Sequence, residues 1–565
     1  MSGEPIGQTG QNESEPHRMS VEKCSTGEPS PCVLGEGSLG PSANSGKVVH
    51  RSGGVSAAGM SGSVAGVNQE ISSGAGLRGR ATAGASPLGE VVRAGGEVGG
   101  SHSSQEVQDS TTCAEPRGAT CAQADQSSAG QGDGWTHLLS EWVQIVTPAK
   151  VQKLQRTLYR KAKAEPGYRF YSLYGDVCRR DVLETALAQV THNGGCAGVD
   201  GVKLDTIQKD ETSRNTWLKE LAEELRTKRY RPEAVLRVAI PKGDGKTRPL
   251  GIPTVKDRVV QMAVLVVLLP IFEADMHRHS YAYRPGKSAH QALRAIAEAV
   301  KRGKHEIIDA DLTGYFDSIP HDRLMKLVAR RISDGSVLEL IAAWLKAPVE
   351  ERDPKSGKRT RRRNERGTPQ GGVISPLLAN IYLNRLDWEV NERCRGKPEM
   401  IRYADDFVIL AGRGQGPGLM ERLKSWLEAR GLSLNERKTR LVDIRQAPIK
   451  FLGFSLSWRR RLRPEHYLHI EAHPKSQQKL RDKVKERLNH WTEHQDEGET
   501  VRSLNRLLKG WAGYFRFGNH SRVFNKMQYY VSRKLERWLR RRHRQKLAWD
   551  EARTLAQSYN LYRLA

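Results

Sequence analysis

Apolar side chains recur at helical spacing from residue 135 onward. Leu138, Leu139, Trp142 and Val143 open this pattern, spaced as on one face of a helix. The periodicity predicts further helices at about 149–164, 179–192, 214–228, 256–274, 288–301 and 418–430, with another starting near His321. After about residue 470 the pattern predicts helices alone.

Short apolar runs between these helices predict strands. The predicted strand segments are 235–240 and 247–253, which form a hairpin across a Gly-Asp-Gly turn, then 306–312, 400–410 (a second hairpin) and 440–456 (a strand pair). The 400–410 hairpin hinges at Ala404 and Asp405. Helices and strands mixed in this way predict an α+β fold.

Composition separates residues 1–134 from the rest of the chain. This stretch has no Phe, Trp or Tyr, holds 26 of the 54 glycines, and carries 8 basic against 14 acidic side chains. Such a segment buries too little apolar area to offset the entropy of ordering, so we expect a disordered tail. The sequence leaves open whether the tail is translated.

The remaining residues carry 83 basic and 50 acidic side chains. This excess predicts a polyanionic partner, because neutralising phosphates releases counterions. The longest apolar stretch, 259–272, is shorter than the ~20 residues of a transmembrane helix, so we expect no membrane span. The seven cysteines lack zinc-ligand spacing, which predicts no zinc site and fits a reducing compartment.

Three carboxylates lie where predicted strands end. Asp311 closes the run EIIDADL, and Asp405 and Asp406 lie at the tip of the 400–410 hairpin. Grouped carboxylates repel each other and suit Mg²⁺, and two such ions ~4 Å apart catalyse phosphoryl transfer. An Asp pair at a hairpin tip is equally compatible with ordinary, solvated turn chemistry.

These acids occur within a longer series of motifs, and together the motifs resemble the reverse transcriptases of bacterial group II introns, also called intron maturases. The resemblance covers about residues 150–560. The motifs, in the family's order, are GVDG (198–201), IPKGDGKTRPLGIP (240–253), SYAYRPGKSAHQAL (280–293), DADLTGYFD (309–317), GTPQGGVISPLL (367–378), YADD (403–406), GLSLNERKT (431–439), KFLGF (450–454) and GWAGYFRFG (510–518).

The resemblance implies a right-hand polymerase, in which α+β fingers and palm precede an all-helical thumb and maturase domain. It implies four segments: a disordered tail (1–134), a basic helical extension of the fingers (135–220), the fingers and palm (221–456), and the thumb with the maturase-specific domain (457–565).

The resemblance also implies roles for individual residues. Asp311 and Asp405 match the carboxylates that bridge two Mg²⁺ ions, and Asp406 matches a third acid nearer the primer terminus. Phe316 matches the ring that excludes a ribose 2′-hydroxyl, although an ordinary core Phe is the alternative. Tyr403 is expected near the primer end.

Four polar residues match the nucleotide pocket of the family. Gln370 corresponds to a residue lining the pocket, and Gly371 beside it suggests close backbone approach by a ligand. Lys242 and Arg248 match finger residues that hold the triphosphate, since a guanidinium fork suits phosphate oxygens. Lys438 resembles the lysine of the region after the palm.

Two basic runs are candidates for RNA binding. Residues 533–546 hold eight Lys or Arg beside a narrow apolar stripe, and residues 358–366 form a second run that we expect to be a loop. The arginines chosen from them are Arg540, Arg541 and Arg542, and Arg361, Arg362 and Arg363. A solvated basic face without a partner is the alternative. In the 510–518 motif, Trp511 and Phe515 are expected in the core, and Tyr514 could stack on bases.

The resemblance implies an RNA-directed DNA polymerase that binds its group II intron RNA, assists splicing and copies the intron into DNA. Its implied partners are the intron RNA, a DNA target or primer and dNTPs, with a possible homodimer, in the bacterial cytoplasm at the nucleoid. The absence of a Cys-His cluster and the end at Ala565 suggest that no endonuclease follows, so a primer would come from elsewhere, such as a replication fork. The alternatives are a retron or defence-associated reverse transcriptase, or a splicing-only maturase.

Overall fold

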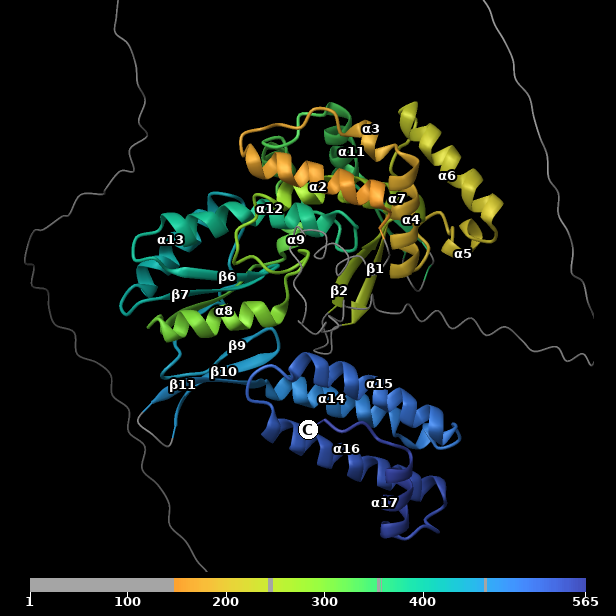
Figure 1. The fold of residues 1–565 in the computed structure, drawn as a ribbon, viewed down its shortest axis with the longest axis vertical. Helices are drawn as coiled ribbons and strands as arrows, with labels where there is room; N and C mark the ends of the chain where they lie inside the picture. The colour runs from red at the N-terminus through yellow and green to blue at the C-terminus, as the bar shows by residue number, and fades with distance from the viewer. Residues whose placement is uncertain (1–146, 242–246, 353–355, 357, 462–464, 565) are drawn as a thin grey trace, which may run out of the picture. The chain divides into compact units, whose positions relative to one another are not determined.

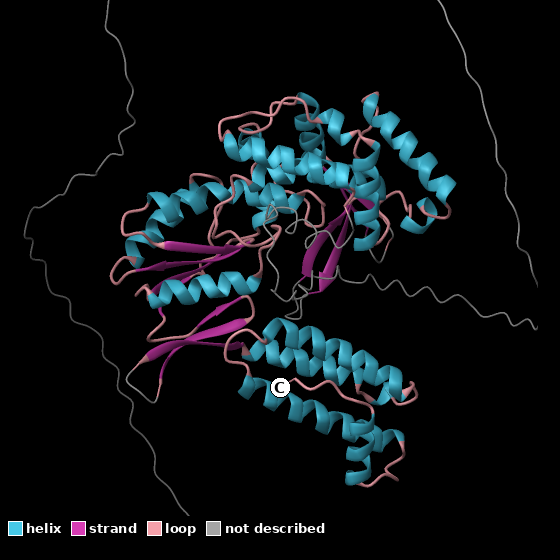
Figure 2. Cartoon of the chain, in the orientation of Figure 1, coloured by secondary structure: helices cyan, strands magenta, loops and turns pink. Residues whose placement is uncertain are grey.

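Three sheets and the helices that cover them make up the part of the chain described by the computed structural model (Figures 1 and 2). It describes residues 147–241, 247–352, 356, 358–461 and 465–564, all within one compact unit. The expected tail, the start of the 135-onward pattern and Lys242 lie outside the described residues.

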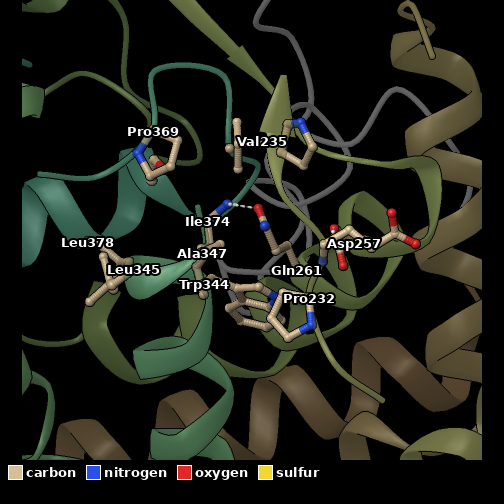
Figure 3. Close-up of a pocket in the computed structure, with 14 residues that line it drawn as sticks. Pro232, Val235, Asp257, Gln261, Trp344, Leu345, Ala347, Pro369, Ile374 and Leu378 are labelled. Carbon is tan, nitrogen blue, oxygen red and sulfur yellow. Dashed lines mark hydrogen bonds between the residues drawn. The ribbon is translucent and has the colours of Figure 1, made fainter. Parts of the chain in front are cut away.

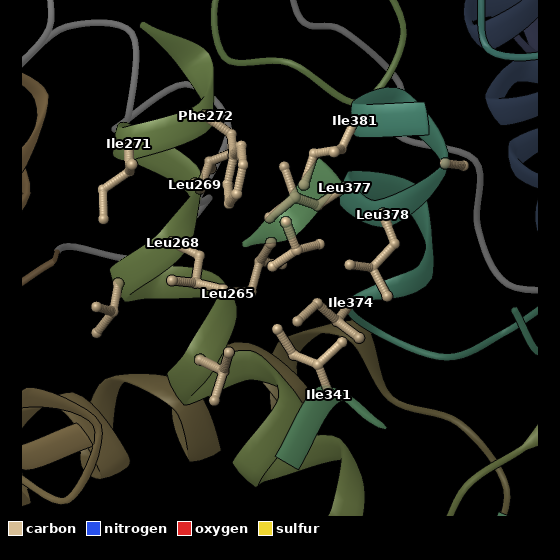
Figure 4. Close-up of a cluster of buried hydrophobic side chains, with 14 of the residues drawn as sticks. Leu265, Leu268, Leu269, Ile271, Phe272, Ile341, Ile374, Leu377, Leu378 and Ile381 are labelled. Atoms are coloured by element: carbon tan, nitrogen blue, oxygen red, sulfur yellow. The ribbon is translucent and has the colours of Figure 1, made fainter. Parts of the chain in front are cut away.

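The N-terminal helices pack around one long buried helix. The elements are α2 (Ala149–Ala164), α3 (Tyr174–Val177), α4 (Arg180–Asn193), α5 (Leu204–Ile207), α6 (Glu211–Arg226) and α7 (Val255–Glu273). Helix α7 is buried along nearly its whole length, because α2 and α4 cover it on one side and α12 (Ser375–Trp388) on another. In Figure 4, Leu377 and Ile381 of α12 lie opposite Leu269 and Phe272 of α7. Among the described helices, none has the length and apolarity that a membrane crossing needs.

The first sheet, called the hairpin sheet, has the strand order β2-β1-β4-β5. Its strands are β1 (Val235–Pro241), β2 (Thr247–Ile252), β4 (Val349–Arg352) and β5 (Arg359–Arg362). The predicted β1–β2 hairpin is confirmed, with its turn outside the described residues. The prediction of a loop at the 358–366 basic run is wrong in part, because β5 pairs with β4. Arg361 lies opposite Glu350 and bonds its carboxylate at 2.9 Å, which offsets the charge of the run.

The second sheet, called the central sheet, has the order β6-β7-β3-β8. Its strands are β6 (Glu399–Tyr403), β7 (Asp406–Ala411), β3 (Glu306–Asp311) and β8 (Arg440–Asp443), all antiparallel to their neighbours. Ile308 and Ala310 face a core shared with α12, whereas Ile307 faces the core of the C-terminal region. The helices that complete this part are α9 (Tyr315–Ser318), α10 (His321–Val328), α11 (Gly335–Lys346), α13 (Gly416–Glu428) and the short π-helix Glu389–Arg393.

The third sheet, called the C-terminal sheet, contains β9 (Ile449–Phe451), β10 (Phe454–Arg460) and β11 (His466–Ala472). The predicted strand pair at 440–456 is therefore wrong as a unit. Strand β8 joins the central sheet beside β3, where Leu441 and Val442 find apolar partners, and β9 turns back onto β10 through Leu452 and Gly453 at positive φ. Helix α8 (Ala289–Lys301) packs against both sheets.

The C-terminal region is helical from residue 474, as predicted. Its helices are α14 (Pro474–Arg487), α15 (Glu497–Phe515), α16 (Ser521–Arg542), α17 (Trp549–Ser558) and a single turn at His490–Thr492. The apolar stripe of α16 is buried, including Trp538. Phe515 is buried and Trp511 is partly buried against the same core, whereas Tyr514 is 36% exposed.

Candidate active site

The register of the central sheet brings the three candidate carboxylates to one end. Asp311, the last residue of β3, lies directly opposite Asp406, the first residue of β7. Tyr403 also pairs with Asp406, so Ala404 and Asp405 form a two-residue turn, and Ala404 adopts φ +62°. Asp311 and Asp406, almost a hundred positions apart in the sequence, thus lie side by side at the same end of the central sheet.

The electrostatics of this edge are those of crowded negative charge. Burial raises the pKa of Asp406 to about 7, with further contributions from Asp309, Asp405 and Asp311. Asp309 was not among the predicted site residues. It lies two residues before Asp311 on the same face of β3, and Arg440 donates to its carboxylate at 3.1 Å. The alternation of acids in DADL (309–312) could have indicated that Asp309 lies on the same face of the strand as Asp311.

Asp311 is held by two side chains from the segment after α13. Lys438 contacts its Oδ2 at 2.9 Å and Asn435 donates to the same oxygen at 3.1 Å. The backbone N–H of Asn435 also donates to the Asp311 carbonyl at 2.8 Å. Lys438, predicted as a nucleotide-binding residue, is therefore in direct contact with a candidate metal ligand.

The donor set fits a divalent cation. In the part of the chain that the structure describes, no three His, Cys, Asp or Glu side chains already surround a common point. The three carboxylates nevertheless lie at one end of the central sheet and supply the hard oxygen atoms that Mg²⁺ prefers. A bound cation would relieve the burial and like-charge repulsion that raise the pKa of Asp406.

A buried arginine supports the Ala404–Asp405 turn, and sequence reasoning missed it. The guanidinium of Arg402 is fully buried and pairs with buried Asp387 at 2.6 Å. It also donates to the Asn380 amide oxygen at 2.8 Å, to the Ser280 hydroxyl at 2.7 Å and to the Ala404 carbonyl at 3.0 Å. Its Nε–H donates to a second oxygen of Asp387 at 2.8 Å, so all five N–H donors of the guanidinium are used.

Phe316 and Gln370 belong to two segments that the backbone ties together. Helix α9 begins after Gly314 at φ +52°, and Phe316 on it is partly buried against the core. The Phe316 carbonyl accepts from the Thr368 N–H at 2.7 Å. The Gln370 carbonyl accepts from the Gly251 N–H of β2 at 2.5 Å, so the 367–378 motif joins the hairpin sheet to α9.

Glycine at 371 is required by this close approach. Gly371 has φ +115°, and a Cβ atom there would lie 2.3 Å from the Gly251 carbonyl oxygen. Arg248 lies exposed on the same strand, β2, as Gly251. The structure therefore brings the segments of Arg248 and Gln370 together, whereas Lys242 lies outside the described residues.

A small pocket behind the hairpin sheet shows how the 367–378 motif is anchored (Figure 3). Its lining is largely apolar and includes Trp344 and Pro232. Gln261 of α7 accepts from the Val373 N–H at 2.8 Å, and the longer bond to the Ile374 N–H is drawn in Figure 3. Gln261, a polar residue within the apolar 259–272 stretch, thus fixes the loop that follows Gln370.

The predicted RNA-binding arginines fall into two groups in the structure. Arg362 and Arg363 are exposed at β5, beside the paired Arg361. On α16, Arg541 pairs with Glu493 at 2.6 Å and Arg542 pairs with Glu497 at 2.6 Å. Arg541 therefore holds α16 to the segment before α15, and Arg542 holds it to the first residue of α15, so neither side chain points freely into solvent. The third predicted arginine of α16, Arg540, packs its guanidinium 4.3 Å from the Trp549 ring centroid.

Other cations on the C-terminal helices crowd each other. Burial lowers the pKa of Lys534, and so do the nearby charges of Arg541, Arg537 and Lys485. Lys485 and Arg537 are exposed on α14 and α16, which pack together. We call Lys485, Lys534 and Arg537 the α14–α16 cation patch.

Comparison with known proteins relates these segments to described families. Residues 240–456 match the model of the reverse transcriptase (RNA-dependent DNA polymerase) family, and residues 477–555 match the group II intron maturase-specific domain. Protein YkfC of Escherichia coli (strain K12) is 34% identical over 347 residues, covering 54% of this chain and 88% of YkfC.

A second relative and one solved structure extend the comparison. The group II intron-encoded protein LtrA of Lactococcus lactis subsp. cremoris is 28% identical over 355 residues, covering 52% of this chain and 57% of LtrA. A telomerase structure from Candida albicans shares 14% identity with a TM-score of 0.33, covering 61% of this chain and 67% of that one.

Proposed function

Because this chain belongs to the family of group II intron reverse transcriptases and maturases, we propose that it copies its intron RNA into DNA by two-metal phosphoryl transfer. The observation that carries the proposal is the direct pairing of Asp311 with Asp406 beside the Asp405 turn. Within the region that matches the polymerase family, this is a compact set of oxygen donors suited to divalent cations.

The residues of the site suggest a division of labour. Asp311, Asp405 and Asp406 would hold two Mg²⁺ ions. Cations bound there supply the chemistry of activating the primer hydroxyl and stabilising the leaving oxygen. Phe316 would lie under the sugar of the incoming nucleotide and exclude a 2′-hydroxyl, and Tyr403 would lie near the primer end.

Basic and polar side chains would bind the nucleotide. Arg248 would contact the triphosphate together with Lys242, since a guanidinium fork matches phosphate oxygens. Gln370 would line the pocket beside the close backbone approach at Gly371. Lys438 contacts Asp311 at 2.9 Å, so its ammonium group would lie beside the metal-binding carboxylates and near the phosphates of a bound nucleotide.

We propose that the same protein binds the folded intron RNA and assists its splicing through the C-terminal helices. The match of residues 477–555 to the maturase-specific domain supports this role. The α14–α16 cation patch is the favoured contact with phosphates, because its charges crowd each other and Lys485 has only an exposed 3.6 Å contact with Asp482, whereas Arg541 and Arg542 pair with carboxylates at 2.6 Å. Arg362 and Arg363 at β5 offer a second basic surface.

The remaining expectations follow from this role. We propose the division into a finger extension (135–220), fingers and palm (221–456) and thumb with maturase domain (457–565). The DNA partners would be a target or primer and dNTPs, in the bacterial cytoplasm at the nucleoid, and a homodimer is compatible with the role.

Sequencing of the RNA that co-purifies with the protein from its own cells, after a high-salt wash, tests the RNA partner. We expect enrichment of one structured intron RNA that contains this reading frame. Recovery of bulk RNA without an enriched intron would remove the splicing and mobility part of the proposal, leaving the polymerase part to its own test.

A further inference from the structure

Tyr283 is an exposed aromatic residue in a stretch of otherwise buried positions. Its residue surface is 42% exposed, whereas Ala282 before it is 1% exposed and Arg284 after it is 6% exposed. Its backbone adopts φ +57°, a left-handed conformation that bulky side chains rarely occupy. Strain of this kind persists where the surrounding structure fixes the backbone, and it gathers at functional sites.

The residues around Tyr283 are fixed on both sides. Arg284 pairs with Glu273 at 2.6 Å and donates to the carbonyls of His277 at 2.7 Å and Ser280 at 2.5 Å. Asn380 of α12 donates to the Ala282 carbonyl at 2.8 Å. The loop between α7 and α8 therefore has little freedom to turn the Tyr283 side chain into the core.

The same loop extends the edge of the central sheet next to the catalytic turn. Ser280 bridges to Arg402 of β6, and the Tyr281 N–H donates to the Arg402 carbonyl at 2.9 Å. Three residues after Arg402 comes Asp405. Partial burial raises the pKa of the Tyr283 hydroxyl, as do the charges of Asp405 and Tyr403, whereas the charge of Arg248 on β2 lowers it. The hydroxyl therefore lies within electrostatic reach of both the turn and β2.

We propose that Tyr283 is a nucleic-acid contact of the polymerase site, and that its ring packs against the terminal base pair of the primer–template duplex. A tyrosine ring is apolar on its faces and polar at its tip, which suits a base pair whose edge is wet. The neighbouring turn carries Asp405 and Tyr403, which are expected at the primer end. The ring is therefore placed for the duplex terminus, beside the nucleotide whose triphosphate Arg248 would hold. This inference rests on the proposed polymerase function.

Three substitutions separate the ring from the backbone. Y283A removes the ring, Y283F keeps the ring without the hydroxyl, and Y283G removes the ring while accepting the left-handed backbone. The measurement is the equilibrium affinity of the full chain for a fluorescent DNA primer annealed to an RNA template, without dNTPs. We expect the Kd of Y283A and Y283G to rise about tenfold, since a base–aromatic contact has that magnitude, and the Kd of Y283F to stay near that of the unaltered protein.

The KM for dNTP, measured at saturating primer–template, supplies the second readout. We expect it to be unchanged in Y283G, whose backbone needs no strain. An unchanged Kd in both Y283A and Y283G would overturn the proposal, and so would a shift in the KM for dNTP without a shift in Kd. A wild-type protein that binds primer–template but extends no primer would instead refute the proposed polymerase function, so the two failures are distinguishable.

Discussion

Replacement of Asp406 by Asn should stabilise the metal-free protein while removing a proposed metal ligand. A pKa of about 7 against an ordinary 3.8 sets a ceiling of about 4 kcal/mol on the cost of ionising Asp406 in the folded state. The side chain is partly solvated, so screening lowers the expected gain from Asp406→Asn to about 1–3 kcal/mol. The cause is burial beside three other carboxylates, which a neutral amide relieves.

The gain should depend on pH in a defined direction. Below about pH 4 the carboxyl is protonated in both folded and unfolded chains, so the two proteins differ little. Between about pH 4 and 7 the unfolded chain loses the proton while the folded chain keeps it, so the wild-type protein loses stability as pH rises. Above about pH 7, the pKa of Asp406 in the folded chain, both chains are ionised and the difference in stability between the two proteins is constant. The gain should therefore grow up to pH 7 and then level.

Urea denaturation in EDTA at pH 5, 6 and 8 measures this gain. Asp205→Asn is a matched control, because Asp205 is an exposed carboxylate on α5. Added Mg²⁺ should shrink the difference at pH 8, since it stabilises the ionised wild-type site. Equal stability of Asp406→Asn and wild-type protein at pH 8 in EDTA would refute the electrostatic reasoning.

Three further variants test the residues around the site and the α14–α16 cation patch. Arg402→Lys cannot replace the five donated bonds and leaves buried Asp387 poorly paired, so urea denaturation should show a loss of about 3–5 kcal/mol; unchanged stability would contradict the support role. Phe316→Ala should lower discrimination against ribonucleotides about tenfold or more in primer extension, since the steric block is removed; retained discrimination would return Phe316 to an ordinary core role. Replacing Lys534 and Arg537 together by Gln should reduce the slope of log affinity for intron RNA against log salt by about 2, and an unaltered slope would exclude the α14–α16 cation patch as the contact.

Much of the fold was predictable because its signals are local. The helices at α2, α4, α6, α7 and α8, the β1–β2 hairpin and the hairpin that carries Asp405 follow from apolar spacing and turn residues. The family resemblance is confirmed by the matches at 240–456 and 477–555, and with it the α+β fold and the helical C-terminal region. The roles assigned to individual site residues stay predictions.

What the sequence did not reveal depends on long-range contacts. Arg402 finds its partners on α12 and in the α7–α8 loop, segments that nothing in a local pattern connects. Strand β8 pairs with β3 from more than a hundred residues away, and β5 forms within a basic run because Glu350 lies opposite Arg361. The exposure of Tyr283 and its left-handed backbone become visible only in three dimensions.

Primer extension tests the central claim most directly. The full chain would be given a DNA primer on an RNA template with dNTPs and Mg²⁺, beside Asp405→Asn and the control Asp205→Asn. The account predicts Mg²⁺-dependent extension by the wild-type and control proteins, none by Asp405→Asn, and intron RNA binding by all three. Equal extension by Asp405→Asn, or no extension by the wild-type protein, would contradict it.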